Sequence, residues 1–172
     1  MGLIIVSSLL TLSSCSSSDD DGGNGGNAPS GRLTAKVDGN NYQSVEVASS
    51  ATVANNGQNL IIIAANSDGN GFAMSIFGYN GVGTYDLTGA DPLVTHTASY
   101  TEIEVDLNNP QNSNTEIWQA PYDNTMVGSI SVSEETDTHV RGTFTFTCKN
   151  VNGDQSVKNI IDGSFNLNKQ VQ

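Results

Sequence analysis

Residues 140–149 read VRGTFTFTCK and residues 161–167 read IDGSFNL, and a turn signal at Asn152-Gly153 lies between them. In the first stretch apolar residues or glycine alternate with threonines, so one side of the chain is apolar and the other carries hydroxyl groups. Alternation with a period of two is typical of a half-buried strand. We therefore predict an antiparallel hairpin here, and it points to an all-β fold.

Two further hairpins are predicted upstream. The first joins residues 33–37 to residues 42–47, and the second joins residues 60–65 to residues 72–77. The run at 60–65 shows no alternation, which predicts a strand that is covered on both faces.

A strand at residues 102–107 alternates three acidic side chains with Ile103, Val105 and Leu107. We expect its apolar side to be dry and its acidic side to be wet. No window shows the apolar recurrence at three and four residues that a helix requires.

The composition is consistent with this pattern, because only 14% of the 172 residues are charged and glycine occurs 18 times. A chain of this length predicts one domain. We predict a single-domain antiparallel β-sandwich or flattened β-barrel of about ten short strands, and the sequence does not choose between these two.

The formal net charge is −12, from 18 acidic and 6 basic side chains. Such a chain repels phosphate backbones, so we expect no nucleic-acid partner. We expect the chain to be a monomer.

The N-terminal stretch predicts an export signal. Residues 3–12 are apolar but too few to cross a bilayer, which takes about 20 residues. Residues 12–15 (LSSC) resemble a lipobox, so we expect a signal peptide at 1–14 and lipid attachment to Cys15. No Lys or Arg precedes the apolar stretch, which indicates either a start upstream of Met1 or a weak signal.

Residues 15–31 contain no large apolar side chain and predict a flexible tether between the lipid and a folded domain at 32–172. The acidic cluster in the tether resembles the export signal of surface lipoproteins of the Bacteroidota; its residues are Ser18, Asp19, Asp20 and Asp21. By that resemblance we expect the protein to be held in the outer membrane and to face the cell exterior.

Four short phrases are similar to those of a Bacteroidota lipoprotein family whose domain has no assigned function. They are TAKVDG at 34–39, GTYDL at 83–87, GTFTF at 142–146 and DGSF at 162–165. The resemblance spans nearly the whole mature domain and implies no particular chemistry.

The sequence offers no catalytic residues, no metal site and no cofactor motif. Asn66–Gly71 resembles the start of a calcium loop, but Phe77 occupies the position of the bidentate glutamate, so we predict a plain turn. His96 and His139 lack the further ligands that a zinc site needs, and we expect both near the surface. Three glutamates offer carboxylate pairs of the kind that glycosidases use, but we interpret them as a solvated strand face: Glu102, Glu104 and Glu116.

Three other side chains, one cysteine and two aromatic residues, stand out in the sequence. Cys148 follows the apolar alternation of its strand, so we predict a small core residue and no disulfide with Cys15. Trp118 and Tyr122 are possible contacts for a glycan or a protein ligand, but a single tryptophan more often fills one end of a core.

These observations predict a non-enzymatic, membrane-anchored binding or structural module. Two alternatives remain open. One is a carrier that holds a small ligand inside a barrel, and the other is a glycan-active enzyme that uses carboxylates.

Overall fold

The computed structural model describes residues 27–91, 93 and 95–171. These residues form eleven strands, and their helical segments are two single 3-10 turns, η1 (Glu46–Ala48) and η2 (Pro110–Asn112). The predicted all-β fold is therefore confirmed.

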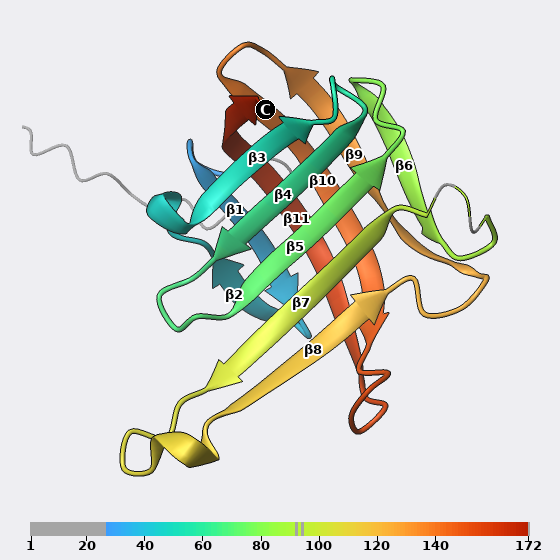
Figure 1. Ribbon diagram of the computed structural model, residues 1–172. Coiled ribbons are helices and arrows are strands. Elements are labelled where there is room, and N and C mark those ends of the chain that lie inside the picture. The colour runs from blue at the N-terminus through green and yellow to red at the C-terminus, as the bar shows by residue number, and fades with distance from the viewer. Residues whose placement is uncertain (1–26, 92, 94, 172) are drawn as a thin grey trace, which may run out of the picture.

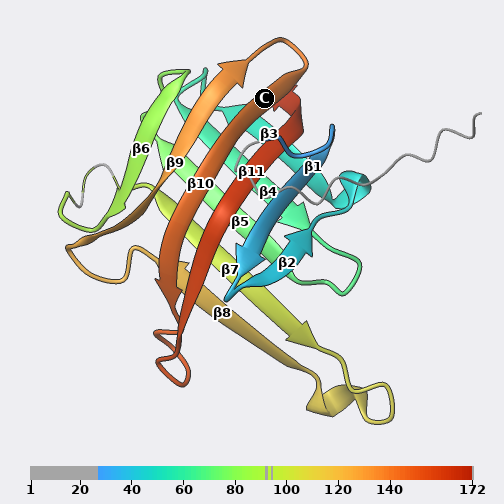
Figure 2. The same ribbon diagram turned by 180° about the vertical axis from the view of Figure 1, so that it is seen from behind.

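The strands form one continuous sheet that folds into two layers facing each other (Figure 1, Figure 2). The front layer contains β3 (Ser49–Ala54), β4 (Asn59–Ala65), β5 (Gly71–Phe77), β7 (Thr97–Glu104) and β8 (Asn114–Ala120). The back layer contains β2 (Asn40–Gln43), β1 (Arg32–Val37), β11 (Val157–Val171), β10 (His139–Lys149), β9 (Met126–Glu135) and β6 (Gly83–Thr88), in that spatial order.

Backbone hydrogen bonding joins the two layers at both sides. On one side β11 runs parallel to β3, with Lys169 opposite Ala51. On the other side β10 meets β8 through the single pair Lys149 and Gln119. Because both sides are joined, the domain is a flattened barrel with an otherwise antiparallel sheet.

All three predicted hairpins form. β1 pairs with β2, β4 pairs with β5, and β10 pairs with β11, each in the antiparallel sense. The predicted calcium-like segment is the turn between β4 and β5, where the Asn66 side chain accepts hydrogen bonds from the backbone amides of Asp68 and Asn70.

Aromatic rings fill the space between the layers. Phe72 of β5 lies at their centre, with ring centroids 4.8 Å from Tyr42, 4.9 Å from Tyr100, 5.5 Å from Phe144 and 6.4 Å from Phe146. These rings come from both layers, and all are buried. The space between the layers around Phe72 is therefore occupied by aromatic side chains.

Two expectations about the front layer are wrong. The run at 60–65 is covered on one face only, because alternate residues of β4 point outward and Ile63 is 51% exposed. The predicted dry side of residues 102–107 is also exposed; its side chains are Ile103 at 38%, Val105 at 54% and Leu107 at 87%.

The register of β7 explains the second error. Ala98 and Tyr100 point into the core, so Glu102 follows them on the inner side by alternation. The same alternation puts Ile103 on the outward side of β7, where it is 38% exposed.

Candidate functional site

The outward surface of the front layer, here called the front face, is built by alternate residues of five strands. The antiparallel registers place the following residues on it: Ser50, Thr52, Ala54, Asn59, Ile61, Ile63, Ala65, Gly71, Ala73, Ser75, Phe77, Thr97, Ser99, Thr101, Ile103, Thr115, Ile117 and Gln119. All of them are described, and none is charged.

The strands point this set outward because the intervening residues are needed inside. Leu60, Ile62, Phe72, Met74 and Tyr100 alternate with it and are between 0% and 4% exposed. The hydrophobic effect thus fixes which residues point into the core, and the residues between them form the front face.

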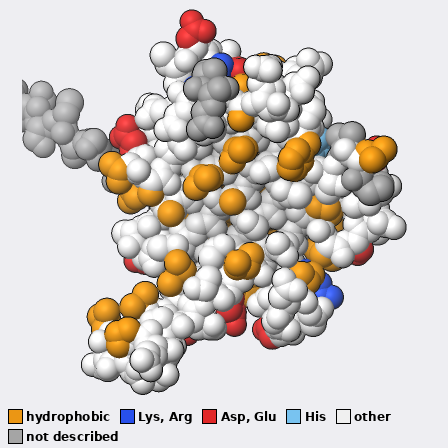
Figure 3. Space-filling model, in the orientation of Figure 1, with side chains coloured by type: hydrophobic (Ala, Val, Ile, Leu, Met, Phe, Trp, Pro, Cys, Tyr) orange, Lys and Arg blue, Asp and Glu red, His pale blue; other side chains and the backbone are white. Residues whose placement is uncertain are grey.

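The front face combines hydroxyl and amide side chains with large apolar ones. Four large side chains are substantially exposed on the front face: Ile63 at 51%, Phe77 at 45%, Ile103 at 38% and Ile117 at 45%. Figure 3 shows hydrophobic side chains spread over this face, with acidic and basic groups at its margins. An exposed apolar surface rimmed by polar groups is typical of an interaction site.

The front face is not flat. A hollow of about 280 Å³ runs over β5, β7 and the end of β8, and its lining includes Ala73, Ser75, Ser99 and Gln119. The neighbouring strand β4 carries the larger Ile61 and Ile63. The face therefore has an isoleucine ridge beside a trough of small and hydroxyl-bearing residues.

Positive charge is confined to the other layer. All six Lys and Arg residues of the chain lie on back-layer strands: Arg32, Lys36, Arg141, Lys149, Lys158 and Lys169. Most of the acidic residues lie in loops or on the back layer. The charged side chains of the described residues therefore lie around the front face and not on it.

The segment that precedes β1 is attached to the back layer. The Ala28 amide donates to Ser164 Oγ at 2.9 Å, and Asn166 Nδ2 donates to the Ala28 carbonyl at 3.5 Å. Ala28 is 5% exposed, so packed structure begins before Arg32, where the sequence analysis placed its start.

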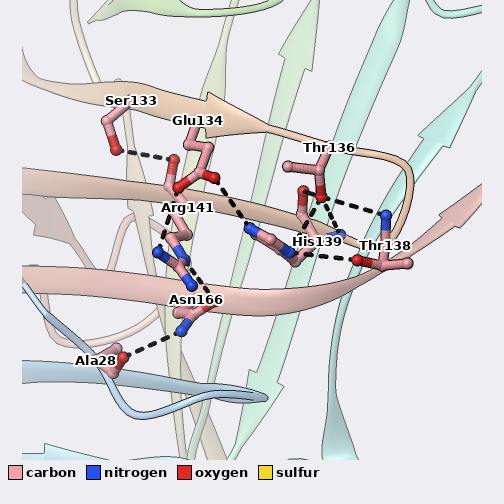
Figure 4. A network of polar contacts seen from close by, with 8 residues as sticks. All are labelled: Ala28, Ser133, Glu134, Thr136, Thr138, His139, Arg141 and Asn166. Atoms are coloured by element: carbon pink, nitrogen blue, oxygen red, sulfur yellow. Dashed lines mark hydrogen bonds and ion pairs between the residues drawn. The ribbon is translucent and has the colours of Figure 1, made fainter.

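A polar network supports this attachment (Figure 4). Arg141 Nε donates to Asn166 Oδ1 at 3.1 Å, and Arg141 also lies 3.2 Å from Glu134. Glu134 in turn lies 3.3 Å from the ring of His139, which sits at the start of β10. Asn27 and Ala28 thus lie against the back layer.

The three glutamates singled out in the sequence lie together on the inner side of the extended β7–β8 hairpin. Glu102 and Glu116 are cross-strand partners, and with Glu104 they line a surface hollow of about 340 Å³. Lys158 lies 2.9 Å from Glu102 and 3.8 Å from Asp38, so it offsets part of this charge. No group of three or more histidine, cysteine or acidic side chains among the described residues is arranged to hold a metal ion.

Trp118 is a core residue, as the simpler of its two interpretations predicted. It is 3% exposed, its Nε1 donates to Ser156 Oγ at 2.9 Å, and Lys158 Nζ lies 4.3 Å from its ring centre. Its ring faces are therefore not available for stacking on a sugar. Tyr122 is partly buried and lies 3.3 Å from Thr147 through its hydroxyl group.

Cys148 is also in the core and fully buried, and burial raises the pKa of its thiol to about 12. His96 is partly buried, and burial lowers the pKa of its ring. The predicted lipid attachment site Cys15 and the acidic cluster at 18–21 lie outside the described residues.

The sequence pattern alone did not predict the front face. Its signal was present, because residues 49–65 and 71–77 place uncharged side chains at every outward position. Such a signal becomes visible only after the inward positions are known.

No helix within the described residues is long and apolar enough to span a bilayer.

Comparison with known proteins adds a family but no activity. No curated protein and no solved structure matches the chain. Residues 29–167 match the family described as a domain of unknown function (DUF6252), and the chain belongs to this family.

Proposed function

We propose that this protein is a non-enzymatic binding module, lipid-anchored through Cys15 in the outer membrane of a Bacteroidota cell and exposed to the cell exterior. The front face is its contact surface. The observation that carries the proposal is a five-strand face without charge on a chain whose net charge is −12.

The charge pattern indicates the kind of partner. A cationic contact surface would find no carboxylate on the front face, and an acidic contact surface would be repelled by the acids around it. A partner surface that is uncharged and exposes both isoleucine side chains and hydroxyl groups avoids both problems.

The attachment of Ala28 to the back layer supports the anchored orientation. A tether that leaves from the back layer allows the front face to remain clear of the lipid. The segment at 16–26, rich in serine, aspartate and glycine, gives the domain further reach from the membrane.

The anchor is tested in cells with the variant Cys15→Ala. We expect the unmodified chain in the membrane fraction and the variant in the soluble fraction. A variant that stays in the membrane would show that another segment holds the protein there.

Use of the front face is tested by thiol labelling of intact cells with a membrane-impermeant maleimide. Ala73→Cys places a thiol on the front face, and Val157→Cys places one at a residue of the back layer that is 52% exposed. Cys148 should not compete, because it is fully buried.

We expect the Ala73→Cys thiol to react several-fold more slowly on cells than in a dilute purified sample, because a partner covers it. The Val157→Cys thiol should react at the same rate in both. Equal rates for Ala73→Cys on cells and in dilute solution would refute the binding role of the face, and no labelling of either variant on cells would refute exposure to the exterior.

A further inference from the structure

We propose that the partner of the front face is a second copy of the same chain, so that the protein forms a face-to-face dimer. This inference rests on the proposed function and names its partner. It replaces the expectation of a monomer that was made from the sequence alone.

The first argument is charge. Two copies that each carry −12 repel one another, and contact is least unfavourable where the acidic groups are farthest from the interface. The front face is such a surface. The back layer is less suitable, because its charges already pair within the chain, as Lys36 does with Asp162 and Arg141 does with Glu134.

The second argument is shape. The ridge of Ile61 and Ile63 on β4 lies directly beside the trough over Ala73, Ser75 and Ser99. A two-fold axis that lies in the interface, parallel to the strands and between β4 and β5, places the ridge of each copy over the trough of the other. The same patch is then used on both copies, as a two-fold dimer requires.

The third argument is the sequence of β4. The run of apolar residues at 60–65 is typical of a strand buried on both faces, yet one copy buries only the side of Leu60 and Ile62. A second copy, packed at the usual distance of about 10 Å between sheets, would cover the other side.

The size of the face sets the strength of the dimer. Five strands spaced about 4.8 Å apart, with about seven residues each at about 3.3 Å, give a projected area of about 550 Å². This lies below the roughly 800 Å² per partner of a standard stable interface, so the dimer should be weak and depend on concentration. Confinement of the lipidated chain to a membrane would raise its effective concentration.

The experiment is sedimentation equilibrium of the mature chain, residues 15–172 with Cys15→Ala, which keeps every described strand and the whole hydrophobic core described above. Over a range from about 10 μM to about 1 mM, we expect the average mass to rise from one chain toward two.

Two variants and one control assign the contact. Ile63→Glu adds an acid to the ridge and Ser75→Glu adds one to the trough, and each should keep the chain at the mass of one copy throughout. Val157→Glu is the matched control, because Val157 is a branched aliphatic residue of a back-layer strand with an exposed fraction of 52%, against 51% for Ile63. It should dimerise like the unsubstituted chain. Thermal unfolding of the three variants shows whether each one folds. If Ile63→Glu does not fold, Ser75→Glu alone tests the contact.

A mass of one chain over the whole range would overturn the dimer, as would a dimer that survives both front-face substitutions. If the mass stays at one chain while Ala73→Cys is protected on cells, the front face has a different occupant and only the dimer fails. If the mass rises but Ala73→Cys is not protected on cells, the proposed function fails.

Discussion

Replacement of Trp118 distinguishes a core role from a ligand-binding role, and the structure allows its effect to be estimated. The side chain is 3% exposed, its ring centre lies 6.3 Å from that of Tyr100, and its indole nitrogen donates to Ser156. Trp118→Ala removes this packing and leaves a cavity, which costs about 3–5 kcal/mol for a buried aromatic residue. For a domain of this size that corresponds to a fall of about 10 °C in Tm.

Trp118→Phe is the matched comparison. It keeps an aromatic ring in the core but loses the donor to Ser156, so we expect a cost of only about 1–2 kcal/mol. Ser156 is partly exposed and can take a water molecule as its new partner.

The assay for all three chains is thermal and denaturant unfolding. Intrinsic fluorescence is measured on the unsubstituted chain as well, because Trp118 is its single tryptophan. In the native state we expect iodide to quench this emission far less than in the unfolded chain. Native emission that is quenched as strongly as in the unfolded chain, or a Trp118→Ala variant with an unchanged Tm, would refute the buried position and restore the aromatic contact as a ligand site.

Two further predictions concern ionisable groups in the barrel. Burial acts to raise the pKa of Glu135, but hydrogen bonds from Lys169 at 2.7 Å and Tyr79 at 2.6 Å outweigh it and hold the pKa below its ordinary value of 4.5. The stabilisation from a carboxylate with a lowered pKa is complete above about pH 4.5 and is lost as the pH falls through the folded-state pKa. Glu135→Gln should therefore have a lower free energy of unfolding than the unsubstituted chain at neutral pH, and this free energy should fall less as the pH is lowered. Urea titrations at several pH values measure both, and parallel pH profiles of the two chains would contradict the prediction. Cys148 is buried and the pKa of its thiol is raised to about 12, so it should resist alkylation at pH 8 in the folded chain. Its reaction should be limited by the rate of global unfolding. Fast alkylation without denaturant would show instead that β10 opens locally.

The sequence predicted the strands well where one side of the chain is strongly apolar. In β10 the alternation that ends at Cys148 identifies both the strand and its buried side, because only one register buries the phenylalanines. The hairpins were predictable for the same reason, since tight turns connect strands that are neighbours in the sequence.

The sequence failed where both sides of a strand are uncharged or where a strand leaves the core. In β4 both sides are apolar, and the pattern does not state how many layers cover them. In β7 Ala98 and Tyr100 point into the core, so Ile103 falls on the outward side and is exposed although its pattern predicted burial.

By itself, then, the amino-acid sequence determined the all-β class, the local hairpins, the core position of Cys148 and the expectation of a lipid on Cys15, because these depend on neighbouring residues and their periodicity. Only the tertiary structure determined the closure of the barrel through β11 and β3 and the charge-free front face. These depend on contacts between residues that are far apart in the chain. A surface shared by five strands has no local signal, because each strand contributes only a few uncharged side chains to it.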